Sequence, residues 1–148
     1  MVNPSSIQPD VELRDYLKGK ISIGDGPSAQ AVTVYSDWER PTNELQNDFI
    51  VIYINGDIAG VSMDTPFARG YMMVSLYNKL NDDGSVKKNR VKKILSQFDE
   101  LIEDLLTENY HFEYDATRFI TPTTPNQSSG YSVTTLNLRW TTISNFND

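Results

Sequence analysis

The residues with the most chemistry to offer are one histidine and an acidic pair at a turn. His111 is the only histidine of the chain, and imidazole is the usual general base near neutral pH. It stands among aromatic residues with strand alternation, which is typical of a packed sheet histidine. Asp82 and Asp83 precede Gly84 as in a calcium loop, but the alternating acidic ligands and the closing glutamate of such a loop are missing. We therefore interpret this stretch as a turn, with Ser85 as the cap of the following helix.

Other motifs that carry chemistry do not occur in the sequence. The chain has no cysteine, which excludes disulfides, thiolate metal sites and a cysteine nucleophile. It also lacks the glycine-rich phosphate loops, the serine elbow and the histidine pair of zinc proteases. Asn126 matches a glycosylation acceptor, but without a secretory signal we attribute that match to chance. We therefore expect no catalytic residues, no cofactor and no metal site.

Length and charge limit the class of protein. The chain has 148 residues, 39% of them hydrophobic, which fits a single domain spanning 1–148. Its net charge of −7 argues against general binding to duplex DNA, which needs basic surface. The longest apolar run, 49–54, is far shorter than the roughly 20 residues that span a bilayer. We expect a protein made in the cytoplasm that does not enter the membrane, with a flexible arm at 1–9 and a tail at 144–148.

The apolar patterns predict an α+β fold with the element order α-β-β-β-α-β-β. A short helix that Asp10 caps and Gly19 ends is followed by strands, a long amphipathic helix and two more strands. We expect a mostly antiparallel sheet of about five strands, packed by the short N-terminal helix and the long helix. The strands are expected at 29–36, 47–57, 71–80, 110–116 and 131–143. The segment 55–70 is either an extended β-arm or a long loop, and 121–130 is expected to be a polar loop.

The long helix, expected over 86–106, carries the strongest signal. At about 100° per residue its apolar side chains fall within one arc of roughly 140°. They are Val91, Ile94, Leu95, Phe98, Leu101, Ile102, Leu105 and Leu106. Burying one such side chain contributes about 1.5–3 kcal/mol, so this stripe is expected to lie on the sheet.

The polar face of that helix has an unfavourable charge order. Basic residues crowd its start and acidic residues its end, whereas the helix dipole favours the reverse order. Several like-charge pairs four residues apart each cost roughly 0.2–0.5 kcal/mol. One interpretation is a solvated face whose cost the core absorbs. The other is a bipolar surface, on which the basic end of one copy meets the acidic end of the next.

The order of these segments resembles a known family. A short helix and "FIVIYI" lead to "RGYMMVSLYNK", then to "NDDGSVKKNRVKKILSQFDELIEDLL", "YHFEYDATRFITP" and "GYSVTTLNLRW". Over residues 10–143 this pattern is similar to the tail terminator (tail-completion) proteins of long-tailed bacteriophages and related neck or tail ring proteins. The resemblance implies a virion structural protein of the tail or neck, without a catalytic site. Such proteins form rings, commonly hexamers, that cap the tail tube, end its polymerisation and join it to the neck and head.

The resemblance also implies partners and surfaces. The partners would be other copies of the chain, the tail tube protein and a neck or head-completion protein, with DNA passing through an acidic lumen without specific binding. The charged helix face, the 55–69 excursion and the loop 121–130 would meet neighbours. The predicted subunit-interface residues are Lys88, Lys92, Lys93, Glu100, Glu103, Asp104, Asp57, Asp64 and Arg69.

Other classes of function remain open at this point. The chain could be another head–tail connector or neck ring protein, or a non-catalytic monomeric adaptor or binding module with an exposed groove over the sheet. An enzyme that uses carboxylate or tyrosine chemistry ranks last, because no nucleophile–base pair is recognisable in the sequence.

Overall fold

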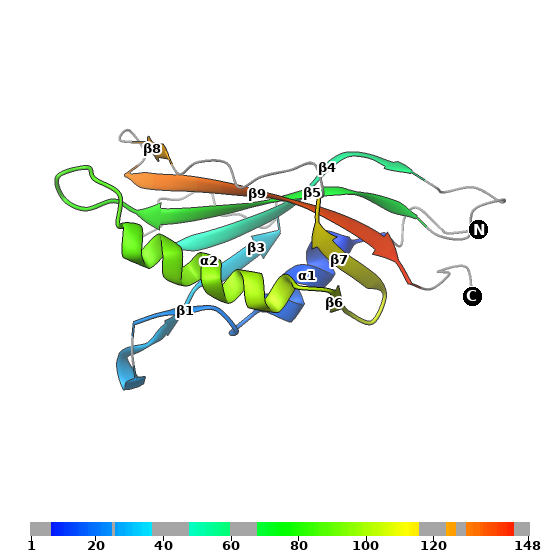
Figure 1. Ribbon diagram of the computed structural model, residues 1–148, viewed down its shortest axis with the longest axis horizontal. Helices are drawn as coiled ribbons and strands as arrows, with labels where there is room; N and C mark the ends of the chain where they lie inside the picture. Colours follow the sequence, from blue (N-terminus) through cyan, green and yellow to red (C-terminus); the bar gives the residue numbers. More distant parts are fainter. Residues whose placement is uncertain are drawn as a thin grey trace.

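The computed structural model describes residues 7–24, 26–36, 48–59, 68–115, 124–126 and 130–143 (Figure 1). Among these residues, two α-helices lie on one face of a mostly antiparallel, curled sheet. The predicted α+β class is therefore confirmed. The sheet has seven strands among the described residues, more than the five expected, because two short strands at 105–106 and 124–126 add to them.

The elements follow one another as a helix, short strands, two long strands, the second helix and the remaining strands. They are α1 (Pro9–Leu17), β1 (Ser22–Ile23), the 3₁₀ helix η2 (Gly26–Ser28), β2 (Gln30–Ala31), β3 (Thr33–Ser36), β4 (Phe49–Ala59), β5 (Arg69–Lys79), α2 (Lys88–Ile102), β6 (Leu105–Leu106), β7 (Tyr110–Tyr114), β8 (Thr124–Asn126) and β9 (Tyr131–Thr142). The main sheet runs β3-β4-β5-β9-β7-β6, with β8 paired to β9, and β1 and β2 form a separate ribbon. β3 is parallel to β4, and every other described pairing is antiparallel.

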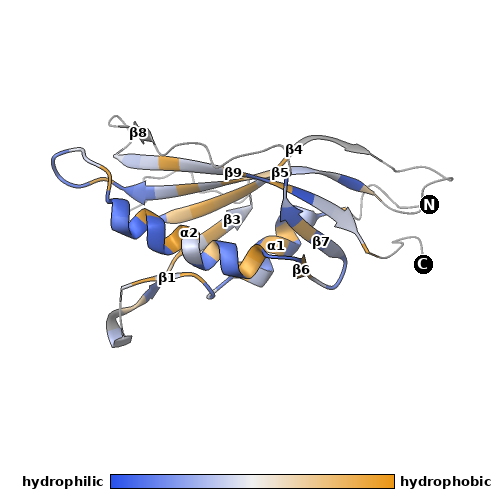
Figure 2. Ribbon diagram, viewed as in Figure 1, coloured by the Kyte–Doolittle hydropathy of each residue, from blue (hydrophilic) through white to orange (hydrophobic). Residues whose placement is uncertain are grey.

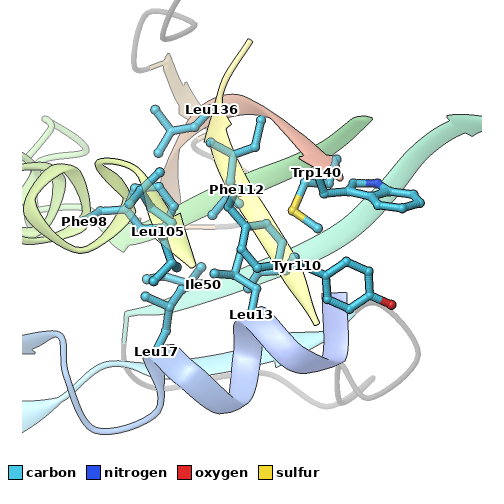
Figure 3. Packing of buried hydrophobic residues seen from close by; sticks show 14 of the residues in the cluster. Leu13, Leu17, Ile50, Phe98, Leu105, Tyr110, Phe112, Leu136 and Trp140 are labelled. Carbon is cyan, nitrogen blue, oxygen red and sulfur yellow. The ribbon is translucent and has the colours of Figure 1, made fainter. Parts of the chain in front are cut away.

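The core lies between the helices and one face of the sheet. Alternate residues of the long strands point to this face, since side chains alternate along a strand. The apolar stripe of α2 and two leucines of α1 pack against them (Figures 2 and 3). The fully buried residues of this core include Leu13, Leu17, Ile50, Ile52, Met72, Val74, Phe98, Ile102, Phe112, Leu136, Leu138 and Trp140. The predicted stripe is confirmed from Val91 to Ile102.

The start of β4 is buried on both faces. Residues 49–52 are at most 3% exposed, and β4 lies between β3 and β5. On the face away from the helices, Phe49 stacks on Tyr77 with ring centroids 4.6 Å apart. Tyr131 meets the same ring edge-on at 5.4 Å. These aromatic residues form a second, smaller apolar cluster.

The first turn of the long helix differs from its prediction. The turn at 82–84 is confirmed, but Ser85 does not cap the helix. Its backbone N–H and its hydroxyl donate to Asp83 Oδ1 at 2.9 and 2.5 Å, which lowers the pKa of that carboxyl. The N-cap residue is Lys87, whose side chain makes no capping hydrogen bond. The prediction failed because Asp83 holds the serine hydroxyl within the turn.

The last turn of the long helix was also predicted wrongly. α2 ends at Ile102, because Asp104 adopts a left-handed backbone conformation with φ of 47°. Leu105 and Leu106 then form β6 and pair with β7. Leu105 is buried at 7% exposure, whereas Leu106 is 63% exposed. The prediction included the two leucines in the helix because their spacing continues its apolar period.

The N-terminal segment is packed further forward than predicted. α1 begins at Pro9, a residue favoured in the first turn of a helix, so Asp10 lies inside the helix and does not cap it. Ile7 is only 5% exposed, and the backbone N–H of Gln8 donates to the Tyr110 hydroxyl at 2.7 Å. Burial raises the pKa of Tyr110 to about 12. The predicted arm 1–9 is therefore wrong at 7–9, while 1–6 lies outside the described residues.

Two segments that were not predicted as strands contain strand residues. They are 55–70, left as either a β-arm or a loop, and 121–130, predicted as a polar loop. The chain from 55 onward continues β4 to Ala59 with a bulge after Asn55, and β5 begins at Arg69, while 60–67 lies outside the description. The predicted polar loop 121–130 includes β8, which pairs with the start of β9. Pro125 is compatible with β8 because a peripheral strand tolerates a missing donor. The predicted tail, 144–148, also lies outside the described residues. Neither described helix has the length and apolar character of a membrane-spanning segment.

Candidate subunit interface

The outer face of α2 carries separated charges. Lys88 and Lys92 near its start, and Glu100 and Glu103 near its end, are all exposed. Within the described part of the chain, these four side chains make no ion pair. At about 1.5 Å per residue, Lys88 and Glu103 lie roughly 22 Å apart along the axis, too far to neutralise each other. The two ends of this face therefore expose opposite charges, an arrangement that both interpretations of the sequence share.

Three other charged residues of this face are engaged within the chain. Lys93 Nζ donates to the carbonyl of Gly24 at 3.0 Å and so tethers the loop after β1 to α2. Asp99 accepts a hydrogen bond from the Tyr114 hydroxyl of β7. Asp104, at the reversal after the helix, places Oδ1 3.8 Å from His111 Nε2. Lys93 and Asp104 were predicted as interface residues, and both have a structural contact as well.

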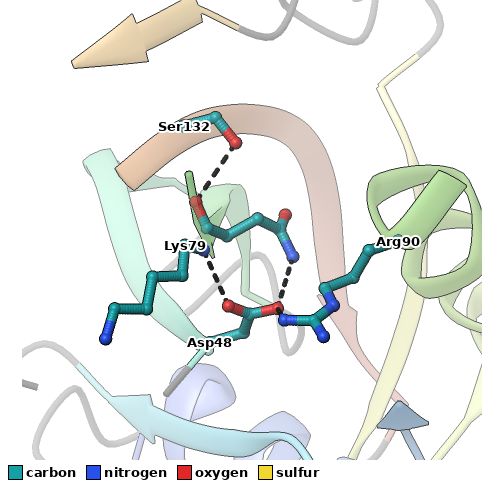
Figure 4. A network of polar contacts seen from close by, with 5 residues as sticks. Asp48, Lys79, Arg90 and Ser132 are labelled. Atoms are coloured by element: carbon teal, nitrogen blue, oxygen red, sulfur yellow. Dashed lines mark hydrogen bonds and ion pairs between the residues drawn. The ribbon is translucent and has the colours of Figure 1, made fainter. Parts of the chain in front are cut away.

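A buried carboxylate fixes the basic start of α2 against the sheet (Figure 4). Asp48 is 4% exposed and accepts the Lys79 backbone N–H at 2.7 Å and Asn78 Nδ2 at 3.1 Å. Arg90 Nη1 of α2 lies 3.5 Å from the same carboxylate. The Ser132 hydroxyl donates to the Asn78 carbonyl at 3.3 Å and links β9 to this corner. The orientation of the basic end is therefore built into the fold.

Sequence reasoning missed this network. Its only local signal is an acid placed directly before the apolar run of β4, which reads as an ordinary strand boundary. The partners of Asp48 stand about 30 and 40 residues further along the chain, at separations of 30, 31 and 42 positions. Such pairs become visible only once the β4–β5 register and the position of α2 are known.

Arg69 lies on a different surface from the charged helix face. It lines a pocket of about 530 Å³ at one end of the sheet, with Tyr71, Glu113 and Arg139. Tyr71, Arg139 and Glu113 are neighbours across β5, β9 and β7, and Arg139 Nη2 pairs with Glu113 Oε1 at 2.8 Å. The sheet register brings this arginine–glutamate pair together, and no local sequence pattern predicted it.

The predicted interface residues therefore divide between two surfaces. Arg69 belongs to the sheet pocket, and the lysines and acids of 88–104 belong to the α2 face. Asp57 lies in β4, but its side chain is outside the description, as is the whole of Asp64. In the residues that the structure describes, no group of three or more histidine or acidic side chains could hold a metal ion.

The uncapped start of α2 provides a stability test. Lys87→Asp is expected to raise the free energy of unfolding of the single chain by about 0.5–2 kcal/mol, because aspartate caps the backbone N–H of the first turn and suits the dipole. Urea denaturation at a concentration where only single chains are present measures the effect. The matched control is Lys92→Asp, which removes the same charge inside the helix and should not stabilise. A destabilised Lys87→Asp protein would contradict the cap geometry.

No protein-family model matches this chain, and comparison with curated proteins finds no significant match. A functional assignment therefore has to be argued from the structure of the chain itself. Its most distinctive feature is the α2 face, where opposite charges are exposed at opposite ends and where the buried Asp48 holds the basic end in place.

Proposed function

We propose that the protein is a homo-oligomeric assembly protein that forms a ring at the head-proximal end of a phage tail. The ring caps the tail tube, ends its polymerisation and joins it to the neck and head. The observation that carries the self-assembly is the separation of charge on the exposed face of α2. The order of elements and the α+β fold support the tail role through the resemblance described above.

The charge order of α2 makes physical sense when a second copy is present. Within one chain it opposes the helix dipole and sets like charges side by side, each at a cost of a few tenths of a kcal/mol. A neighbouring copy that brings its acidic end to the basic start offsets both costs. Its acids suit the positive end of the helix dipole, and they pair with the crowded lysines. The chain as a whole carries −7, so copies repel one another except where a basic surface is offered. The start of α2 is such a surface.

The same contact favours a ring. A basic surface that meets an acidic one is a contact between unlike patches. After one such contact, one copy still exposes its acidic patch and the other still exposes its basic patch. Contacts of this head-to-tail kind either close into rings or continue as filaments. A cap that stops polymerisation has to be closed, and we take the closed ring, commonly a hexamer in the resembling family, as the functional form. Another neck or connector ring would use the same contact.

Charge reversal tests this proposal. In the variant Lys88→Glu/Lys92→Glu/Lys93→Glu, both ends of α2 are acidic, and the dissociation constant of the assembly is expected to rise about 10- to 100-fold, since each exposed ion pair contributes roughly 0.2–1 kcal/mol. Sedimentation velocity measures the change. Circular dichroism checks folding, because Lys93 also holds Gly24.

The complementary variant supplies the control. Glu100→Lys/Glu103→Lys/Asp104→Lys makes both ends basic, so it should also stay dissociated alone. Mixing the two variants restores opposite charges at each contact and should restore assembly. The electrostatic contact is refuted if the Lys88→Glu/Lys92→Glu/Lys93→Glu variant keeps the wild-type assembly mass. It is also refuted if the mixture of the two variants stays dissociated. The tail role is tested separately by negative-stain imaging of purified tail tubes, where the ring should bind one end only.

A further inference from the structure

The main sheet ends in two unlike edges. β3 is the outermost strand on one side of the sheet path, and β6 is outermost on the other. β6 carries Leu106, which at 63% exposure is the most exposed of the large hydrophobic side chains that the structure describes. Acidic residues surround it in the sequence: Glu103 and Asp104 before it and Glu108 after it. Its exposure and its acidic neighbours make Leu106 the candidate contact residue of this edge.

The opposite edge of the sheet offers a groove. A cavity of about 510 Å³ lies between α1 and β3, with Val32, Val34 and Tyr35 among its lining residues. Arg14 of α1 and Lys18, the C-cap residue after it, stand on its rim together with Asp15, to which Arg14 is paired at 2.8 Å. No described strand pairs with the outer edge of β3. The groove therefore joins apolar lining, a strand edge that no described strand pairs with and a net positive rim.

The two edges lie on opposite flanks of α1. Glu12 faces the β6–β7 turn, where its carboxylate accepts the Asn109 backbone N–H at 3.1 Å and Asn109 Nδ2 at 2.8 Å. Arg14 is two residues further on, about 200° around the helix, and lines the groove beside β3. α1 thus separates Leu106 from the groove of its own chain. Contact between these two surfaces has to come from a second copy.

We propose that Leu106 of one copy inserts into the groove between α1 and β3 of the next copy, so that the sheet edges meet head to tail. The inference rests on the proposed self-assembly and names the apolar contact that accompanies the charge contact. The acidic rim of Leu106 faces the rim of Arg14, Asp15 and Lys18, whose net charge is positive. The contact joins unlike surfaces, which is the kind that a ring requires.

Engineered cysteines test the contact directly, because the chain has none of its own. A Leu106→Cys variant is mixed with a Thr33→Cys variant under mild oxidation. Thr33 is exposed at the β3 edge, and a disulfide forms only where Cα atoms approach within about 7 Å. Disulfide-linked dimers are expected in the mixture and not in either variant alone. In the control, Ser96→Cys, exposed on α2, replaces Leu106→Cys and should give no link to Thr33→Cys.

A second variant measures the strength of the contact. Leu106→Glu places a charge in an apolar groove and is expected to raise the dissociation constant about 10- to 100-fold. If the wild-type protein assembles, but no cross-link forms and Leu106→Glu leaves assembly unaffected, this contact alone is overturned. A wild-type protein that stays a single chain overturns the proposed function and this contact together.

Discussion

Trp140→Ala is expected to lower the free energy of unfolding by about 3–5 kcal/mol, the range for a large aromatic side chain removed from a core. Trp140 is fully buried in the middle of the apolar layer. Its ring meets Tyr110 edge-on with centroids 5.8 Å apart and lies directly over Gly70. Removing it leaves a cavity that neighbours on three strands cannot fill without moving the sheet.

Gly70 shows how closely this site is packed. A Cβ added there would lie 2.7 Å from Trp140 Cζ2, closer than real Cβ atoms come to a neighbour. Gly70→Ala is therefore destabilising in the wild-type background and nearly neutral once Trp140 is alanine, which a double-mutant cycle in urea measures. Thr141→Ala, next in the sequence and half-buried, is the control and should cost less than 1 kcal/mol. A Trp140→Ala protein of unchanged stability would contradict the core described here.

Asp48→Ala is expected to cost about 2–4 kcal/mol of unfolding free energy. The carboxylate is the partner of the Lys79 backbone N–H and of the Asn78 amide, and the Asn78 side chain is almost fully buried. Each buried donor left without an acceptor costs about 1–3 kcal/mol. The contact with Arg90 adds less, because that side chain is 37% exposed and the atoms are 3.5 Å apart.

The same substitution should weaken assembly. Arg90 no longer holds the start of α2 at the sheet corner, so the basic end of the helix loses its fixed orientation. Asp82→Ala removes an identical charge from the exposed turn nearby and is the matched control, expected within about 0.5 kcal/mol of wild type. Equal stability of the two variants would show that the buried network contributes nothing.

The sequence predicted the elements whose side chains repeat with a strong period. The apolar stripe from Val91 to Ile102 and the alternation of Leu136, Leu138 and Trp140 are local patterns, and each determines which face is buried. The α+β class followed from their order. The ends of α2 were missed for the opposite reason, because a single left-handed residue at Asp104 outweighed the apolar spacing of Leu105 and Leu106.

The candidate interface was predictable only in part. The charge separation on α2 can be read along the sequence, since neighbouring residues of one helix carry it. The groove beside β3 could not be predicted from the sequence, because α1 and β3 contribute to it from separate segments. The exposure of Leu106 was hidden too, since within the expected helix it belonged to the buried stripe. Contacts that depend on which strands become edges require the sheet order.

The measurement that tests self-assembly most directly is sedimentation velocity of the wild-type protein over a wide range of concentrations, followed by negative-stain imaging. The proposal predicts a species several times the 16.8 kDa of one chain, with a closed ring in the images. A protein that sediments as one chain at every concentration, also in the presence of tail tubes, would contradict it.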